Sequence, residues 1–234
     1  MLFKKKPKKA ARDNKRRLVT MSSPKSPVSE QYRTVRTNIE FSAVDKEIRS
    51  IMVTSSGPGE GKSTTVSNLA VVFANQGKKV LLVDADLRKP TAHYTFDVNN
   101  ITGLTNVLTK RTTLEKAVTE TKEPSLFILP SGPIPPNPAE LLGSKAMQDF
   151  LEDAYQEFDM VLFDTPPVLA VADAQILANY CDGSILVIRS SETEIEQAEK
   201  ARDLLQSAKG KLLGAVLNHK KLHDSQYYYY YGGK

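Results

Sequence analysis

The sequence predicts an α/β fold in which a mainly parallel central sheet is flanked by helices. Between residues 50 and 217, short apolar segments that suit buried strands alternate with segments of helical periodicity. Strands separated by helices pair in parallel through right-handed crossovers, which gives a sheet covered on both faces. A chain of 234 residues, of which 40% are hydrophobic, is long enough to bury the core of one such domain.

Each element of this fold is expected from a local pattern. Strands are expected where apolar residues run without a break, at residues 51–54, 79–83, 126–129, 160–164, 184–188 and 211–217. Helices are expected where apolar residues recur at helical spacing, at residues 30–41, 62–75, 104–108, 114–118, 139–155, 173–179 and 194–208. Ser29 is the expected N-cap of the first helix, and the proline-rich segment 130–138 is expected to be a loop.

A glycine-rich segment between the first strand of the sheet and the next helix has the context that a P-loop requires. It contains Gly57, Gly59 and Glu60, followed by Gly61, Lys62, Ser63 and Thr64. Backbone N–H groups of such a loop converge on phosphate oxygens, Lys62 would reach the β- and γ-phosphates, and Ser63 would place its hydroxyl on Mg²⁺. Ser56 stands where the motif usually has its first glycine. The alternative interpretation is a turn that only connects strand and helix.

Carboxylates follow two other expected strands. Asp164 ends the strand 160–164, the setting of a Walker B acid that holds Mg²⁺, usually through water. Asp84 and Asp86 lie two residues apart after the strand 79–83, so in extended geometry both point to the same side. Such a pair can divide metal binding from the orientation or deprotonation of a nucleophile. Because parallel strands share one carboxyl edge, we expect these acids and the P-loop to form one ligand site.

The net charge of +5 belongs to the N-terminal arm. Residues 1–17 contain nine Lys or Arg and one Asp, a net charge of +8, so the remaining residues carry −3. A nucleic-acid-binding face on the body of the protein is therefore not expected. The arm is interpreted either as a disordered, solvated segment or as a contact with anionic lipid, worth about 1 kcal/mol per basic residue near the surface. No apolar run approaches the roughly 20 residues that span a bilayer, and Cys181 is the only cysteine, which favours a cytoplasmic protein.

The two ends of the chain differ from the α/β body. Residues 1–27 are expected to be a disordered basic arm and linker, residues 28–218 the P-loop domain, and residues 219–234 a flexible tail. Within the helix at residues 28–42, Glu30, Arg33 and Arg36 are spaced by three and share one face, which fits an ion pair on a solvated surface or a contact with another subunit. The tail contains five adjacent tyrosines. They fit a low-complexity segment without function, or an adhesive or nucleic-acid-stacking segment, although little positive charge lies beside them.

In these motifs the chain resembles the bacterial tyrosine kinases, P-loop protein kinases unrelated in fold to the eukaryotic ones. The resemblance is collinear and covers nearly the whole chain after the arm. It rests on Glu30-x-x-Arg33-x-x-Arg36, the Walker A segment 56–63, the A′ motif 82–88, the Walker B segment 164–167 and the terminal tyrosines. The chain is also similar to the MinD/ParA ATPases, which usually carry a signature lysine at the position of Gly57, and this difference favours the kinase branch.

The resemblance implies an ATP- and Mg²⁺-dependent protein-tyrosine kinase. It implies that one subunit phosphorylates the tail of a neighbour in a ring, with Glu30, Arg33 and Arg36 at the subunit contact. The target residues would be Tyr227, Tyr228, Tyr229, Tyr230 and Tyr231. It further implies other protein substrates, a membrane-protein activator that recruits the cytoplasmic kinase to the inner face of the membrane, and a role in capsule or exopolysaccharide production.

The expected roles of the site residues combine the motifs with this resemblance. Lys62 neutralises charge on the phosphates, Ser63, Asp86 and Asp164 hold Mg²⁺, and Asp84 orients or deprotonates the tyrosine hydroxyl. The expected nucleotide contacts also include Gly57, Gly59, Glu60, Gly61, Thr64 and, at the adenine, Asn218. Two alternatives stay open at this point: a MinD/ParA-like ATPase that controls membrane or filament assembly, and a regulatory subunit without enzymatic activity.

Overall fold

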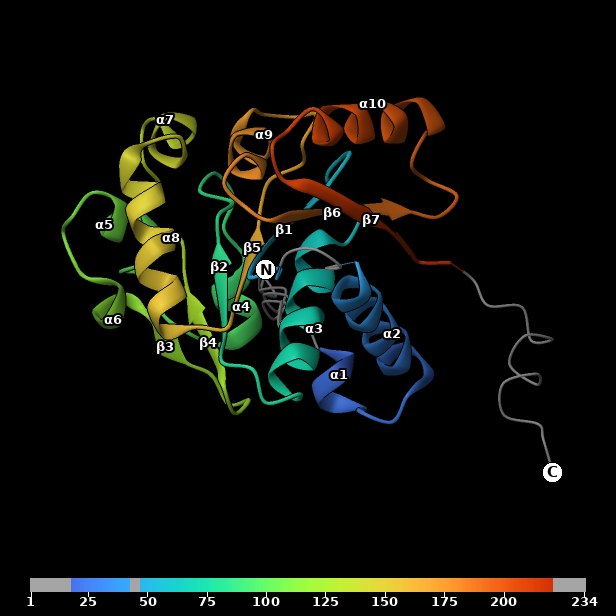
Figure 1. Ribbon diagram of the computed structural model, residues 1–234, viewed down its shortest axis with the longest axis horizontal. Coiled ribbons are helices and arrows are strands. Elements are labelled where there is room, and N and C mark those ends of the chain that lie inside the picture. Colours follow the sequence, from blue (N-terminus) through green and yellow to red (C-terminus); the bar gives the residue numbers. More distant parts are fainter. Residues whose placement is uncertain (1–17, 43–46, 221–234) are drawn as a thin grey trace, which may run out of the picture.

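The protein forms a three-layer α/β/α domain with one sheet at its centre (Figure 1). This computed structural model describes residues 18–42 and 47–220. Within these residues, the sheet has seven strands in the order β3-β4-β2-β5-β1-β6-β7. All neighbouring strands are parallel except β3 and β4, which pair antiparallel at one edge. The predicted mainly parallel α/β fold is therefore confirmed.

The element bounds agree with the predicted strands to within about two residues at each end. The strands are β1 (Ser50–Ser55), β2 (Val80–Asp84), β3 (Thr119–Glu120), β4 (Leu126–Leu129), β5 (Met160–Asp164), β6 (Gly183–Arg189) and β7 (Lys211–Asn218). The helices are α1 (Val19–Ser22), α2 (Pro27–Phe41), α3 (Lys62–Ala74), α4 (Ala92–Phe96), α5 (Leu104–Leu108), α6 (Leu114–Ala117), α7 (Pro138–Leu142), α8 (Lys145–Glu157), α9 (Asp173–Ala178) and α10 (Ile195–Gln206).

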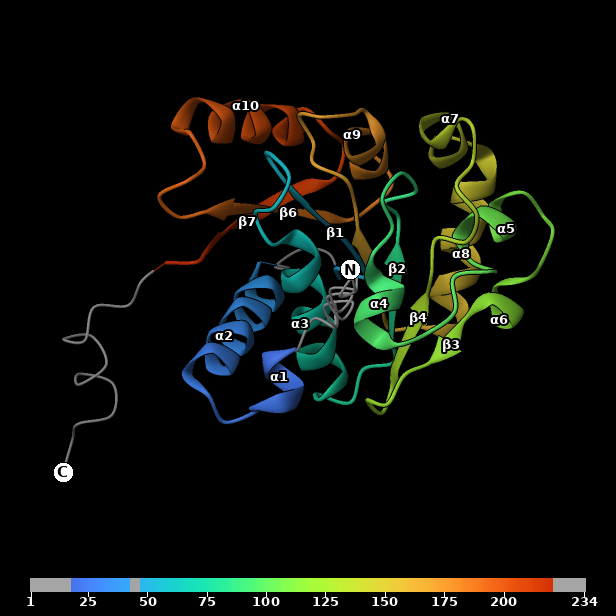
Figure 2. The same ribbon diagram turned by 180° about the vertical axis from the view of Figure 1, so that it is seen from behind.

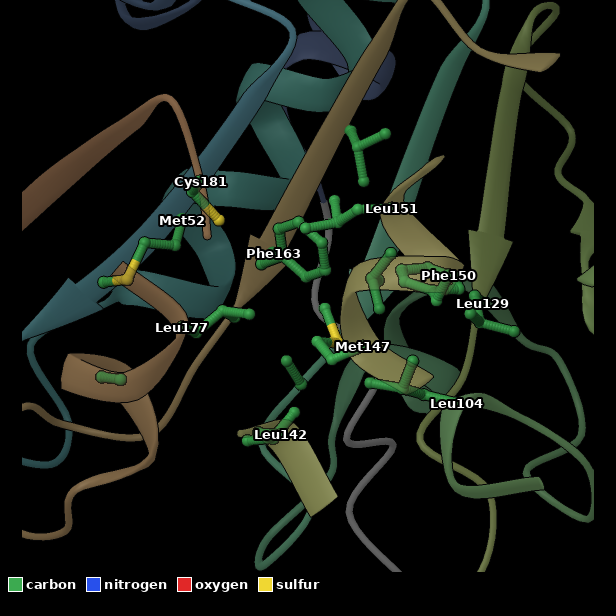
Figure 3. Packing of buried hydrophobic residues seen from close by; sticks show 14 of the residues in the cluster. Met52, Leu104, Leu129, Leu142, Met147, Phe150, Leu151, Phe163, Leu177 and Cys181 are labelled. Atoms are coloured by element: carbon green, nitrogen blue, oxygen red, sulfur yellow. The ribbon is translucent and has the colours of Figure 1, made fainter. Parts of the chain in front are cut away.

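Alternating side chains of the central strands supply two cores, one on each face of the sheet. Ile51 and Val53 of β1 point toward α2 and α3, whereas Met52 between them points toward the opposite helices. The second core contains Phe163 of β5 together with Met147 and Phe150 of α8 (Figure 3). Because β1, β2 and β5 are buried along their whole length, they read as continuous apolar runs rather than as alternating ones. Views from both sides place α1, α2 and α3 together on one face, away from α8, α9 and α10 (Figures 1 and 2).

Three local predictions differ from the structure. The helix expected at residues 139–155 is two helices, α7 and α8, interrupted at Gly143 and Ser144. Helix α2 starts at Pro27 with Ser26 as its N-cap, not Ser29, because the Ser26 side chain accepts the backbone N–H of Ser29 and proline suits the first helical turn. The short elements α4 and β3 were not predicted at all, since neither is long enough to show a period.

Helix α1 corrects the predicted extent of the disordered arm and linker. Thr20 is buried, and its N–H and hydroxyl donate to Asn68 Oδ1 of α3 at 3.1 and 2.8 Å. Ser29 of α2 is fully buried and donates to the carbonyl of Ser23 at 2.8 Å. These tertiary hydrogen bonds order a four-residue helix that has no stability of its own.

The remaining arm and most of the tail lie outside the described residues. The basic segment 1–17 and the tyrosines Tyr227–Tyr231 belong to these parts, so the predictions that concern them stay predictions. Among the described helices, none has both the length and the apolar character to cross a bilayer.

Candidate active site

The P-loop joins β1 to α3 at the carboxyl edge of the sheet. Gly61 is the N-cap of α3 and has φ of +99°, and a Cβ atom at this position would lie 2.0 Å from Asn218 Nδ2. Gly59 also has a positive φ, of +83°. Both positions therefore favour glycine. The first N–H groups of α3, at Lys62, Ser63 and Thr64, have no acceptor within the helix, and together with the helix dipole they give a geometry that favours an anion.

Lys62 connects the P-loop to the acids of two neighbouring strands. Its Nζ lies 3.2 Å from Asp86 Oδ2, 3.2 Å from Asp164 Oδ1 and 3.3 Å from Ser63 Oγ. Burial lowers the pKa of Lys62, but the negative charges of Asp164 and Asp86 and their hydrogen bonds outweigh this, so its pKa lies above the ordinary value. The ammonium group therefore stays charged at neutral pH between two carboxylates.

Strand register brings Asp84 next to Asp164. The two residues are partners in the parallel pairing of β2 with β5, and β5 in turn pairs with β1. Asp84 Oδ2 accepts the N–H groups of Thr91 and Ala92, both at 2.9 Å. Asp84 Oδ1 is buried and has no hydrogen-bond partner within the described chain. Burial, followed by the charge of Asp164, raises the pKa of Asp84 from an ordinary 3.8 to about 7, against the lowering effect of its two N–H donors.

The loop after β2 is fixed by two further hydrogen-bonded acids. Asp86 Oδ1 accepts the N–H of Lys89 at 3.0 Å, which leaves Oδ2 for Lys62. Arg88 binds Asp173 in two places, with Nε to Oδ2 at 2.8 Å and Nη2 to Oδ1 at 3.0 Å. Asp173 is completely buried at the start of α9. Arg88 is the last residue of the A′ motif, whereas Asp173 belongs to no motif, because no local signal pairs residues 85 positions apart.

Two of the residues expected to touch the nucleotide have side chains directed elsewhere. Glu60 is buried, and its carboxylate accepts the N–H of Ser56 at 2.9 Å and the hydroxyl of Thr193 at 2.7 Å. Asn218 Nδ2 donates to the Glu60 carbonyl at 2.9 Å, so this side chain packs against the backbone of the P-loop. The predicted contact of Asn218 with adenine stays a prediction. Thr193 was not identified from the sequence.

The predicted oligomerisation residues lie on α2, which packs on α3. They are not part of the acidic cluster. Arg33 forms an ion pair with Glu30 and donates to the carbonyl of Pro24 at 2.8 Å. Arg36 Nη1 donates to the carbonyl of Val72 in α3 at 2.8 Å. The three side chains were expected to act as one face, but Arg36 is half-buried against its own subunit because α2 packs closely on α3. Their role in a subunit contact stays a prediction.

The acidic cluster fits a magnesium ion. Ser63 Oγ, Asp86 Oδ2 and Asp164 Oδ1 all lie within 3.3 Å of the Lys62 ammonium, so three oxygens of the kind that Mg²⁺ prefers gather around one cationic group. The described residues contain no group of three or more Asp, Glu, His or Cys side chains arranged to enclose a metal. Mg²⁺ does not need such a group, because it usually binds one or two carboxylates and completes its shell with water and phosphate oxygens.

Comparisons with known proteins identify relatives of this chain. A family model described as an AAA domain matches residues 48–208. The tyrosine-protein kinase YwqD of Bacillus subtilis is 60% identical over 219 residues, which cover 94% of this chain and 92% of the relative. The similarity therefore extends beyond the P-loop to almost the full length of both proteins.

Solved structures place the fold in the same group. The chimerical protein CapA2B2 matches with a TM-score of 0.85 and 40% identity, over 88% of this chain and 90% of that chain. The cell division ATPase MinD of Pyrococcus furiosus matches with a TM-score of 0.65 and 26% identity, over 76% and 75% of the two chains. The weaker match to MinD agrees with a P-loop ATPase fold. The stronger matches, to YwqD and CapA2B2, separate the tyrosine kinases from the MinD-like ATPases. The chain belongs to the bacterial tyrosine kinases, within the P-loop ATPases, and is a protein-tyrosine kinase.

Proposed function

We propose that this kinase transfers the γ-phosphoryl group of ATP, bound with Mg²⁺, to the tyrosines of the tail of a second subunit. The observation that carries the proposal is the Lys62 ammonium group, held at 3.2 Å from both Asp86 and Asp164 beside the open end of α3. Charge-neutralising groups and oxygen ligands meet there at an anion site, which is what phosphoryl transfer requires.

The roles follow from the position of each group. The N–H groups at the start of α3 and the Lys62 ammonium bind the phosphates and neutralise the charge that develops on them. Ser63, Asp86 and Asp164 would hold Mg²⁺, which supplies electrostatic stabilisation to the phosphate oxygens when it is bound. The deep position of these acids keeps them in fixed orientations, so little reorganisation is needed during the reaction.

Asp84 is the proposed base. Its pKa of about 7 lies near the operating pH, and the unpartnered Oδ1 has capacity to accept one more hydrogen bond. Its Oδ2 is fixed by two backbone N–H groups, which hold the carboxylate in place. We assign Asp84 to orienting the tyrosine hydroxyl and accepting its proton, and Asp86 to the metal.

The tail and α2 provide the proposed means of reaction between subunits. Tyr227 lies nine positions after Asn218, which ends β7, and this length spans roughly 30 Å when extended. Glu30 and Arg33 are the proposed subunit contact of a ring, and Arg36 assists it. We further propose a membrane-protein activator that brings the kinase to the inner face of the membrane, other protein substrates, and control of capsule or exopolysaccharide synthesis.

The experiment mixes two full-length variants, neither of which can phosphorylate its own tail. A Lys62→Met chain keeps its tail but lacks the charge at the phosphates, and a chain with Tyr227–Tyr231 changed to Phe keeps the site but lacks acceptors. Incubated together with Mg²⁺·ATP and an activator, they should yield phosphate on the Lys62→Met chain, measured by intact mass. Each chain alone should stay unmodified. Phosphate on wild-type protein but none in the mixture would refute reaction between subunits, and ATP hydrolysis without any phosphoprotein would refute the proposed tail substrate.

A further inference from the structure

Glu60 is a buried carboxylate inside the phosphate-binding loop. A negative charge at this place disfavours a polyphosphate ligand, so the side chain needs a compensating role. Its Oε2 accepts the N–H of Ser56 at 2.9 Å, four residues earlier in the same loop. This hydrogen bond closes residues 56–60 into a ring and fixes the peptide that enters the loop. Ser56 occupies the position where the P-loop motif usually has glycine.

The second carboxylate oxygen of Glu60 ties this ring to the next strand of the sheet. Its Oε1 accepts the hydroxyl proton of Thr193 at 2.7 Å, and Thr193 Oγ1 in turn accepts the N–H of Arg189 at 2.9 Å. Arg189 ends β6, which lies beside β1, and its Nη1 donates to the carbonyl of Gly59 at 3.2 Å. The loop is therefore connected to a rigid strand by side chains 133 and 130 residues away in the sequence.

We propose that Glu60 and Thr193 form a brace that holds the P-loop in its phosphate-binding conformation before the nucleotide arrives. The inference rests on the nucleotide site proposed above, and it makes Glu60 a positioning residue that does not touch the ligand through its carboxylate. Phosphate binding by a loop depends on the orientation of its N–H groups, and a braced loop loses less conformational freedom when the ligand binds. The brace therefore increases the affinity for the nucleotide, because the loop is already ordered before the nucleotide binds.

The test is calorimetric titration of the full chain with Mg²⁺·ADP. Glu60→Ala should weaken binding about tenfold, and Thr193→Val, which removes the hydroxyl but keeps the shape, about threefold. In both variants the stoichiometry should stay near one site per chain. Thr193→Ser should bind like the wild type because it keeps the hydroxyl. Ser191→Ala, an exposed position in the same loop outside the brace, is the matched control and should also bind like the wild type.

A purely structural role gives the opposite signature. Partial unfolding would lower the number of binding sites per chain and leave the dissociation constant of the remaining sites unchanged. That result, for Glu60→Ala and Thr193→Val, would overturn the proposal, as would wild-type affinity in both. Because the two residues act as one unit, the double variant should lose about tenfold and not the product of about thirtyfold. Absence of Mg²⁺·ADP binding to the wild type would instead refute the nucleotide site itself.

Discussion

Buried polar groups lie both where the parallel strands begin, at the amino edge of the sheet, and where they end, at its carboxyl edge. The two edges differ in how these groups are paired. At the amino edge, Asp182 Oδ2 accepts the N–H of Arg49, the N–H of Ser50 and the Ser50 hydroxyl, all at 3.1 Å. Tyr155 donates to Ser50 Oγ at 2.7 Å, and among the described residues no buried side-chain atom of Arg49, Ser50, Tyr155 or Asp182 lacks a partner. At the carboxyl edge, Asp84 Oδ1 and Ser56 Oγ are buried without partners among the described residues.

This difference separates a structural cluster from a functional one. A fully paired polar network fixes one packing arrangement and has no capacity left for a ligand. Asp86 and Asp164 both pair with Lys62, and Asp84 adds a third carboxylate beside Asp164, so like charge is in excess there. A buried oxygen without a donor, such as Asp84 Oδ1, is also costly. Groups of this kind are retained where a ligand completes them, so stability and activity should respond oppositely to substitutions at the two edges.

The largest expected effect is that of Asp84→Asn on the pH dependence of stability. Because the folded-state pKa of Asp84 is raised, the folded protein binds more protons than the unfolded chain between about pH 4 and 7, and its stability falls as pH rises through this range. Asparagine keeps the acceptor for Thr91 and Ala92 but does not titrate. At pH 8 the variant should therefore be more stable than the wild type, by up to about 4 kcal/mol.

Urea unfolding at pH 5 and pH 8 measures this effect. The stability gain of the variant over the wild type should be larger at pH 8 than at pH 5 by about 2–3 kcal/mol. Kinase activity should fall at least about a hundredfold with loss of the base. The conservative control is Glu120→Gln, an exposed carboxylate in β3, for which the same comparison should show no change with pH. An equal stability difference at both pH values would contradict the raised pKa.

The amino edge should respond in the opposite way. Asp182→Ala leaves several buried donors unpaired and should destabilise the protein by about 2–3 kcal/mol, and Tyr155→Phe, which removes one hydroxyl, by about 1 kcal/mol. Neither residue touches the acidic cluster, so the kinase rate at a temperature well below unfolding should stay within about twofold. A large loss of activity in Tyr155→Phe without loss of stability would show that the two edges are not independent.

Sequence patterns predicted the strands of the sheet and their mainly parallel pairing because most of this information is local. Continuous apolar runs mark strands buried on both faces, and the acids that follow them reach a common edge through the parallel register. The patterns failed where tertiary contacts decide. Helix α1 depends on the Thr20–Asn68 hydrogen bonds, and the apolar spacing between residues 139 and 155 continues through the break at Gly143.

The site shows the same limit at the level of single residues. Lys62, Ser63 and the three acids were found because each stands in a motif at a strand or helix end. Asp173 and Thr193 belong to no motif, and only the folded chain brings them to Arg88 and Glu60. Side-chain direction was also beyond the sequence: spacing by three places Arg36 with Arg33, but the packing of α2 turns Arg36 toward α3.

The smallest predicted effects distinguish these two arginines. Arg36→Ala removes a half-buried hydrogen bond to Val72 and should destabilise the subunit by about 1 kcal/mol. Arg33→Ala breaks an exposed ion pair with Glu30 and an exposed hydrogen bond to the carbonyl of Pro24, and should change stability by less than about 0.5 kcal/mol. If the Glu30–Arg33 surface joins subunits, Arg33→Ala should reduce the oligomer size in size-exclusion chromatography with multi-angle light scattering, at a stability equal to that of the wild type. The control is Lys145→Ala, which breaks another exposed ion pair within a helix, that of Lys145 with Asp149. It should leave both stability and oligomer size unchanged. An unchanged oligomer in Arg33→Ala would restrict α2 to its packing role on α3.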